Sequence, residues 1–504
     1  MANLNLEFEL IILKAIIKNR MTLRELEPKI VWEFFDDITK IPRPSKKEEK
    51  IIAYLLEFAK KYNLQAKKDL IGNVVIRKPA TVGFENKKSI VLQSHLDMVC
   101  EKNEGTEHNF ETDSIQTYID NGWVKAKGTT LGADDGIGVA AQLAILAATD
   151  LKHGAIECLF TIDEESGMSG AFNLEENFIE SKILLNLDSE DEGELYIGCA
   201  GGKDTVATFT YEEEKLKKGE AFRITVKGLK GGHSGDDINK GLGNSIKILN
   251  RFLFELINKI EYKLSLFDGG NLRNAIPREA FADIVISSKK KEIVEGLANE
   301  FTQIIRNELG FKAPDALVVC EEIKLPKTAI DKEARRKLLL SLYACPHGEI
   351  RYSDLIPDLV ETSTNLASVK FAENSTIVVT TSQRSSVESA KTDIVNMVQS
   401  VFRLADAKVK SNSGYPGWQP NQNSEILAIA SKSYESVFGN IPKVKAIHAG
   451  LECGLFLEKY PYLDMVSFGP TIKGAHSPDE RLEIKTVQMF WDWLLHILEN
   501  APEK

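Results

Sequence analysis

The feature of this 504-residue sequence that most limits its fold is a regular succession of β-type and helical segments between residues 73 and 187. Short β-type runs are expected at 73–77, 89–94, 155–162 and 182–187, and a helix rich in small residues is expected at 136–148. Strands that alternate with helices predict a sheet of buried, mostly parallel strands. We therefore expect the fold class to be α/β, with a mixed, largely parallel sheet flanked by helices.

Polar clusters follow three of these predicted strands directly. They are Ser94-His95-Leu96-Asp97, Asp163-Glu164-Glu165 and Asp188-Ser189-Glu190. In open α/β sheets, ligands bind outside the carboxyl ends of the strands. The position of the clusters therefore predicts a functional site at that edge of the sheet.

The pattern changes near residue 202, where alternating segments at 222–226, 282–287 and 376–381 are separated by longer helices. This order predicts a separate α+β domain inserted into the α/β domain, as the length of the chain allows. The expected divisions are an extra N-terminal segment at 1–20, the first part of the α/β domain at 21–203, the inserted domain at 204–396 and the second part of the α/β domain at 397–504. Residues 1–20 read as an amphipathic helix ahead of a second plausible start at Met21, and a docking helix and simple upstream sequence both remain open.

The composition bears on partners and on location. The formal net charge of −11 does not favour binding to nucleic acid or to an anionic membrane. Six scattered cysteines without a C-x-x-C pair are typical of free thiols in a reducing compartment. The most apolar N-terminal stretch, 10–17, is too short to span a bilayer and lacks the features of a signal peptide. We expect a cytoplasmic protein without a nucleic-acid or membrane partner.

Seven residues form a candidate metal-binding set: His95, Asp97, Asp134, Glu164, Glu165, Asp188 and His476. One imidazole with carboxylates for each of two ions suits zinc, cobalt or manganese. His95 and Asp97 project to one face of an extended segment, so that the carboxylate can orient the imidazole. A histidine buried near a strand end, with no metal, is the alternative reading of this pair alone.

Asp134 lies in a glycine-rich loop, 128–138, that leads into the small-residue helix. Such a loop could instead bind a phosphate at the helix N-terminus. It lacks the Gly-Lys-Ser/Thr ending of a P-loop, and the adjacent Asp134 and Asp135 would repel phosphate. A carboxylate that bridges two metals is the favoured interpretation.

Asp163-Glu164-Glu165 has two readings. Acidic runs of this kind are often solvated turns. In the functional reading, Glu165 binds metal and Glu164 acts as the general base that takes a proton from water.

Together these motifs resemble a known family. The motifs that carry the resemblance are Ser94–Val99, Gly132–Gly136, Asp163–Met168, Leu187–Glu190, Gly231–Gly235, Asn274–Pro277, His448–Gly454 and Gly474–Pro478. They are similar to the di-zinc exopeptidases that include carnosinases, aminoacylases and carboxypeptidase G, and above all to the bacterial aminoacyl-histidine dipeptidases of that family. The resemblance extends from about residue 31 onward and says nothing of the N-terminal segment.

The resemblance implies a role for each candidate ligand. His95 and Asp188 would bind one zinc, Glu165 and His476 the other, and Asp134 would bridge them. Asp97 would orient His95, and Glu164 would serve as general base and acid.

It also implies substrate contacts. His233 resembles a lid histidine that helps stabilise the oxyanion, and a loop histidine without a role is the alternative. Arg384 resembles a residue that clamps the free carboxylate of the substrate through bidentate pairing, and a surface arginine is the alternative. Asn274, His448 and Glu452 are further substrate-binding candidates.

The resemblance therefore implies a homodimeric metal-dependent dipeptidase that cleaves dipeptides such as carnosine, with a lid that closes over the substrate. An aminoacylase or a tripeptidase with the same two-metal site is the nearest alternative. A non-catalytic peptide- or metal-binding protein is an alternative from another class. The presence of Glu164 argues against that last reading, because binding alone needs no base.

Overall fold

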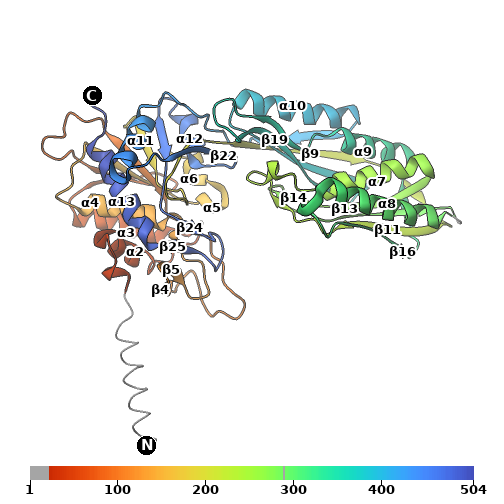
Figure 1. Ribbon diagram of the computed structural model, residues 1–504, viewed down its shortest axis with the longest axis horizontal. Helices are drawn as coiled ribbons and strands as arrows, with labels where there is room; N and C mark the ends of the chain where they lie inside the picture. The colour runs from red at the N-terminus through yellow and green to blue at the C-terminus, as the bar shows by residue number, and fades with distance from the viewer. Residues whose placement is uncertain (1–21, 288–289) are drawn as a thin grey trace, which may run out of the picture. The chain divides into compact units, whose positions relative to one another are not determined.

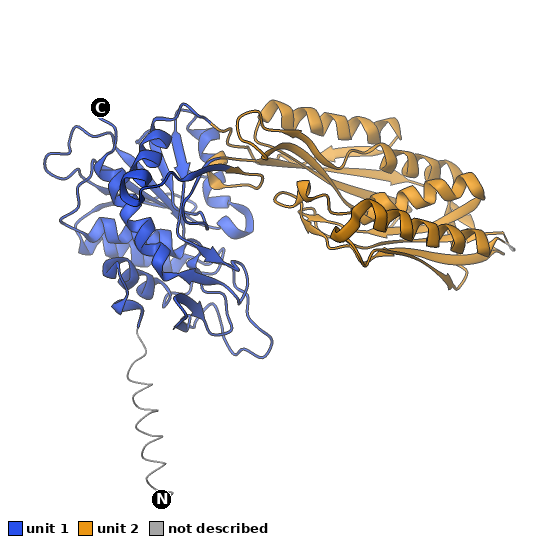
Figure 2. Cartoon of the chain, viewed as in Figure 1, with its two compact units in different colours: residues 1–197, 421–445, 455–504 blue, residues 198–420, 446–454 orange. Residues whose placement is uncertain are grey.

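The computed structural model describes residues 22–287 and 290–504, and these form two compact units (Figures 1 and 2). Unit 1 comprises the chain up to residue 197 together with 421–445 and 455–504, and unit 2 comprises 198–420 and 446–454. Residues 198–203, 397–420 and 446–454, which the predicted boundaries leave to the α/β domain, lie in unit 2. The helix expected at 1–20 lies outside the described residues.

The main sheet of unit 1 is mixed. Its strand order is β1 (Gln65–Lys68), β2 (Val74–Lys78), β6 (Ile156–Thr161), β3 (Ile90–His95), β7 (Ile183–Asn186), β23 (Asp464–Ser467), β8 (Glu194–Cys199) and β22 (Lys443–Ile447). The central strands β6, β3, β7 and β23 are parallel, whereas β1, β2 and β8 pair antiparallel. The expected α/β class and the four predicted strands are confirmed.

Eight helices outside residues 198–420 lie before, between or after the strands of this sheet in the described sequence. They are α2 (Lys29–Ile38), α3 (Glu49–Lys61), α4 (Ala133–Ala147), α5 (Glu164–Gly167), α6 (Ser169–Phe172), α11 (Glu425–Phe438), α12 (Glu452–Lys459) and α13 (Ile484–Glu499), with a 3₁₀ turn η1 at Leu23–Glu25. Helix α4 is the predicted small-residue helix, and it packs against both β3 and α2. Residues 133–146 of α4 are all buried, which explains why glycine and alanine prevail in it.

A smaller antiparallel sheet of unit 1 carries one part of the site. It is formed by β24 (Ile472–Lys473), β25 (Arg481–Glu483), β5 (Trp123–Ala126) and β4 (Thr117–Asp120). The turn between β24 and β25 holds both His476 and Glu480. Strand β25 pairs with β5, and this pairing brings the C-terminal part of the chain to the segment that precedes the Asp134 loop.

Unit 2 has an α+β architecture with an antiparallel sheet. The strand order is β16 (Leu317–Ile323), β11 (Glu220–Lys227), β15 (Ala280–Ile286), β13 (Tyr262–Gly269), β19 (Val360–Ala372), β20 (Thr376–Ser385), β9 (Gly201–Thr210) and β21 (Lys408–Ser411), and β18 (Gly348–Tyr352) also pairs with β19. Two short ribbons join β10 (Glu213–Lys215) to β17 (Thr328–Ile330) and β12 (Gly232–His233) to β14 (Ala275–Ile276).

Four long helices pack on this sheet and complete the hydrophobic core of unit 2. They are α7 (Ser245–Lys259), α8 (Lys291–Leu309), α9 (Lys332–Ala344) and α10 (Glu388–Leu404), with 3₁₀ turns η2 (Ile238–Lys240) and η3 (Gly310–Lys312). Within the described ranges, no helix is both long enough and apolar enough to cross a membrane.

Candidate metal centre

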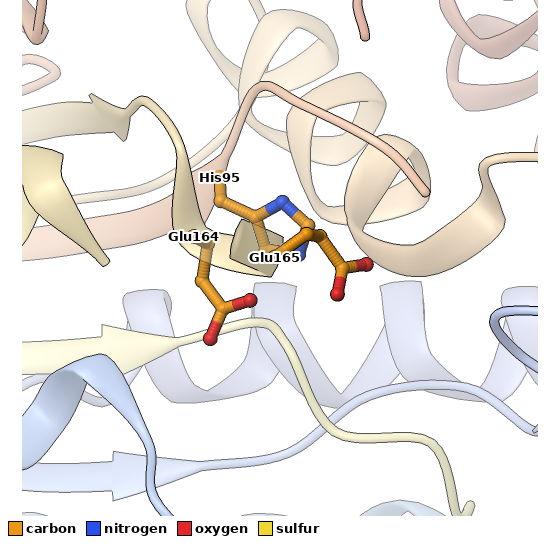
Figure 3. Close-up of side chains that lie close together, drawn as sticks. All are labelled: His95, Glu164 and Glu165. Atoms are coloured by element: carbon orange, nitrogen blue, oxygen red, sulfur yellow. The ribbon is translucent and has the colours of Figure 1, made fainter. Parts of the chain in front are cut away.

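The predicted ligands of unit 1 meet at the carboxyl ends of its parallel strands. His95 is the last residue of β3, Glu164 and Glu165 follow β6, and Asp188 follows β7. Because β6, β3 and β7 are neighbours, their ends bring these side chains together. Figure 3 shows His95, Glu164 and Glu165 side by side at this edge.

Asp134 is the centre of the arrangement, because each of its two carboxylate oxygens faces a different histidine. The Oδ1 atom lies 3.0 Å from Nε2 of His95, and Oδ2 lies 3.2 Å from Nε2 of His476. His95 Nε2 is also 3.5 Å from Oδ1 of Asp188, and His476 Nε2 is 3.0 Å from Oε2 of Glu165. Two histidine–carboxylate sets therefore share one aspartate.

The donor atoms of these sets are close enough to hold cations. His95, Asp134 and Asp188 form one group, and Asp134, Glu165 and His476 form another, each with its donor atoms within 4.8 Å of one another. Oε1 of Glu165 is buried without a hydrogen-bond partner among the described residues, although burying a carboxylate oxygen in that way is costly. A divalent cation would satisfy it, so the donor set fits the predicted dinuclear site.

The electrostatics of the site also favour a cation. Hydrogen bonds with Asp134 and Glu165 raise the pKa of His476 to about 11. Burial would lower the pKa of His95, but Asp188, Asp134 and Asp97 outweigh burial and raise it well above its usual value. Burial and the nearby charge of Asp134 raise the pKa of Asp188. The acids around the two histidines thus favour positive charge at the site, and a divalent ion would supply it.

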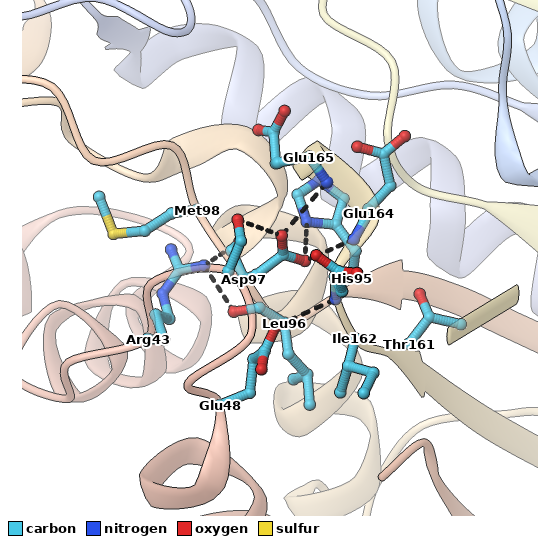
Figure 4. A network of polar contacts seen from close by, with 12 residues as sticks. Arg43, Glu48, His95, Leu96, Asp97, Met98, Thr161, Ile162, Glu164 and Glu165 are labelled. Carbon is cyan, nitrogen blue, oxygen red and sulfur yellow. Dashed lines mark hydrogen bonds and ion pairs between the residues drawn. The ribbon is translucent and has the colours of Figure 1, made fainter. Parts of the chain in front are cut away.

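Asp97 contacts both His95 and the turn that carries Glu164 and Glu165. Its Oδ1 atom lies 3.4 Å from Nδ1 of His95, and its two oxygens accept the backbone N–H groups of Glu164 and Glu165 at 3.0 and 3.2 Å (Figure 4). The Ser45 hydroxyl donates to Oδ2 at 2.7 Å. Burial would raise the pKa of the Asp97 carboxyl, but its bonds with His95 and Ser45 outweigh burial and lower it to about 2. One carboxylate thus ties a ligand histidine to the turn that carries both glutamates.

Asp163 differs from its two acidic neighbours. It has a positive φ of 51° and accepts the hydroxyls of Ser166 and Ser169, so it closes the turn and does not face the ligands. The acidic run is therefore divided, with its first residue bound inside the turn and the next two at the site.

Sequence reasoning missed Arg43 and Glu480. Arg43 lies in the segment 42–45, which reads as a stop between two helices, and Glu480 lies four residues after His476, just beyond the motif around that histidine. Both side chains are about 2% exposed and contact the backbone of the ligand-bearing loops. For Glu480, a charged residue beside a ligand motif was the available signal, whereas Arg43 lies beside no such motif.

The substrate-side candidates of the sequence all belong to unit 2. Pairing of β12 with β14 sets His233 opposite Ala275, so Asn274 is its neighbour, and both line a cavity of about 570 Å³. Arg384 donates to the Tyr415 hydroxyl at 3.2 Å.

His448 and Glu452 are also in unit 2, where they are 6% and 1% exposed. The His448 Nε2 atom lies 2.7 Å from the Ser363 hydroxyl oxygen. Asp236 lies among these residues, because its hydrogen bond with His233 and the charge of Arg384 lower the pKa of the Asp236 carboxyl against the effect of burial.

An α/β unit in which two histidine–carboxylate sets share one aspartate beside the strand ends is typical of a metal-dependent enzyme. The chain belongs to the peptidase family M20/M25/M40, whose family model matches residues 91–500. It is 45% identical over 483 residues to the cytosol non-specific dipeptidase of Escherichia coli (strain K12), a match that covers 96% of this chain and 99% of the relative.

Solved structures agree with this family. The aminoacylhistidine dipeptidase of Vibrio alginolyticus superposes with a TM-score of 0.89 at 47% identity, covering 96% of this chain and 99% of that one. A tripeptidase of Staphylococcus aureus shares the fold with a TM-score of 0.55 at 16% identity, covering 94% and 99%. The family resemblance seen in the sequence is confirmed.

Proposed function

We propose that this protein is a dipeptidase that depends on two divalent metal ions and cleaves dipeptides with a free C-terminus, including Xaa-His dipeptides such as carnosine. The observation that carries the proposal is the shared position of Asp134 between His95 and His476. The names of the E. coli and V. alginolyticus relatives support the dipeptide substrate.

The proposed ligand sets are His95 with Asp188 and His476 with Glu165, bridged by Asp134. Zinc is the proposed ion, since mixed imidazole and carboxylate ligands suit it, and cobalt or manganese would fit the same donors. When bound, the pair of ions would polarise the scissile carbonyl and lower the pKa of water.

Glu164 is the proposed general base and acid. Its carboxylate would take a proton from the attacking water as the water oxygen bonds to the carbonyl carbon. It would then give that proton to the amine nitrogen as the C–N bond breaks. The bond from the Glu164 N–H to Asp97 fixes the start of α5 and so supports this placement of the side chain.

For the substrate-side residues, we propose that His233 stabilises the oxyanion and that Arg384 binds the free carboxylate. Asn274, His448 and Glu452 are proposed as further contacts. Burial of Arg384, with its Nε lacking a hydrogen-bond partner among the described residues, supports a ligand for the guanidinium.

Three further proposals concern the state of the protein. A cytoplasmic location is supported by six cysteines without a disulfide among them and by the name of the cytosolic relative. Unit 2 is proposed to be a lid domain, and the protein is proposed to be a homodimer. The oligomeric state is checked by light scattering after gel filtration.

The decisive experiment compares hydrolysis of carnosine, Leu-Gly, a tripeptide and an N-acetyl amino acid by purified protein. It is run with and without chelator, and with zinc, cobalt or manganese added back. The variant is Glu164→Gln, and Glu176→Gln, an exposed acid of the same unit, is the matched control.

Chelator-sensitive dipeptide cleavage that Glu164→Gln lowers by about 10²- to 10⁴-fold, with bound metal unchanged, supports the mechanism. Cleavage of only the N-acetyl amino acid or the tripeptide would move the function to an aminoacylase or a tripeptidase. A metal-loaded protein that binds these substrates and cleaves none would contradict an enzymatic role.

A further inference from the structure

The loop that carries Asp134 is held by a buried carboxylate from the other end of the chain. Oε2 of Glu480 accepts the backbone N–H groups of Leu131 and Gly132 at 2.7 and 2.9 Å. Oε1 accepts those of Ala133 and Asp134 at 2.7 and 3.3 Å. Glu480 thus satisfies four consecutive amides at the start of α4, where a helix leaves its N–H groups without internal partners.

Arg43 binds the same loop through a carbonyl group. Its guanidinium donates to the carbonyls of Leu96 and Asp97 at 2.9 and 2.8 Å and also to the carbonyl of Gly132. It therefore joins the loop to the segment that follows His95, which Figure 4 shows in contact with Arg43. The guanidinium of Arg43 therefore binds both the loop before Asp134 and the segment after His95.

The glycines of the loop make room for this guanidinium. A Cβ atom on Gly132 or on Gly136 would lie 2.6 Å from Nη2 of Arg43. Gly132 also has a φ of +71°, which side chains other than glycine rarely adopt. Two of the four glycines in 128–138 thus make room for Arg43.

This support acts against a repulsive force. Asp134 lies within the same cluster as Asp188 and Glu165, and like charges at such distances disfavour one another. Without a cation, this repulsion favours a movement of the loop that takes Asp134 away from the other acids, against its contacts with His95 and His476. All four N–H bonds to Glu480 and the three carbonyl bonds of Arg43 oppose that movement.

We propose that Glu480 and Arg43 are positioning residues that hold the Asp134 loop in its metal-binding geometry before the ions bind. Both oxygens of Glu480 are occupied by amides, so it acts through the backbone of Asp134 and is not itself a ligand. Since Asp134 belongs to both ligand sets, its placement affects both ions. The inference rests on the proposed two-metal site.

The test measures zinc affinity by competition with a chromophoric chelator, in the wild type and in Glu480→Gln. Gln keeps the size of the side chain but can accept with only one of its two terminal atoms. We expect the affinity for zinc to fall by about 10- to 100-fold, the range typical for residues that orient metal ligands. Hydrogen exchange of residues 128–136 is followed in the same proteins with and without zinc.

The matched control is Glu157→Gln. Glu157 is 5% exposed and accepts the backbone N–H groups of Glu180 and Ser181 at 2.9 and 2.7 Å, but it lies at the start of β6, away from the strand end that leads to Glu164. It therefore reproduces the loss of a buried, amide-bound carboxylate without touching the site.

A second variant, Arg43→Lys, keeps the buried positive charge but replaces a fork that reaches three carbonyls with a single ammonium group. It is expected to weaken zinc binding in the same direction. If Glu480→Gln does not fold, the result for Arg43→Lys decides.

The inference predicts that residues 128–136 are protected from exchange in the metal-free wild type, but in Glu480→Gln only after zinc is added. Zinc affinity within twofold of the wild type, or an equal loss in Glu157→Gln, would overturn the inference and leave the metal site standing. A wild-type protein that binds no zinc would overturn the proposed metal centre instead.

Discussion

His95 in unit 1 and His448 in unit 2 are both almost fully buried, with 1% and 6% of their surface exposed, yet their pKa values move in opposite directions. The carboxylates of Asp188, Asp134 and Asp97 outweigh burial and raise the pKa of His95. Burial, aided by the charge of Arg384, lowers the pKa of His448 to about 3. The acids around His95 therefore favour a positive charge at that place, whereas the ring of His448 stays neutral.

The comparison teaches that burial alone does not decide what a histidine does in this protein. Unit 1 concentrates acids around its histidines and so provides a place for divalent cations. In unit 2, His448 contacts the Ser363 hydroxyl and lies near the charge of Arg384. Its ring can therefore form hydrogen bonds, but its surroundings disfavour a positive charge.

The largest expected effect contrasts these two histidines directly. His95→Gln should lose bound metal and lower dipeptide hydrolysis by about a thousandfold or more, because several kcal/mol of transition-state stabilisation depend on the ions. His448→Gln should keep both ions. Mass spectrometry measures the metal content of both variants, and initial rates measure their activity. Equal metal loss in both variants would contradict the difference proposed between the two histidines.

A smaller effect is expected from Asp97→Asn, which removes the negative charge beside His95 and weakens the acceptor of the Glu164 and Glu165 amides. Metal affinity should fall by about 10- to 100-fold. Asp331→Asn in unit 2 is the control, because Asp331 also accepts two backbone N–H groups, those of Ala334 and Glu212. Chelator competition measures both variants, and unchanged affinity in Asp97→Asn would contradict the assigned role.

Alanine substitutions at two glycines of unit 1 with positive φ distinguish the cost of backbone strain from the cost of crowding at the site. A Cβ atom on Gly439 would have nothing within 4 Å, whereas a Cβ atom on Gly132 would meet Arg43 and Met98. Gly439→Ala should lower the free energy of unfolding by about 1 kcal/mol and Gly132→Ala by about 2–4 kcal/mol. Urea unfolding compares them, and equal losses would show that the loop packing is loose.

The smallest expected effect is a pH dependence from His448. Its folded-state pKa of about 3 lies below the unfolded value near 6.5, so the neutral ring favours folding above pH 6.5 and this contribution is lost as pH falls towards 3. Between pH 8 and pH 6, the wild type should lose about 1 kcal/mol more unfolding free energy than His448→Gln. The same loss in both proteins would mean that His448 is not held neutral.

Much of unit 1 could be predicted from local pattern. The strands at 90–95 and 156–161 are buried throughout, as parallel strands covered on both faces are, and their apolar runs made them visible in the sequence. The acids that follow these strands predict the ligand-binding edge of the sheet, because the buried apolar runs end there and polar side chains begin. Family resemblance then supplied the assignment of each ligand, which spacing alone left open.

The tertiary structure alone decided which groups support the ligands. Glu480 reaches amides that precede it by almost 350 positions in the chain, and Arg43 meets Gly132 across 89 positions. Neither contact leaves a trace in local periodicity, because periodicity reports which face of an element is buried and not what lies against it. The sequence by itself determined the buried strands, the acids at their ends and the family; the folded chain determined which buried charges hold those acids in place, because such contacts exist only after distant segments have packed together.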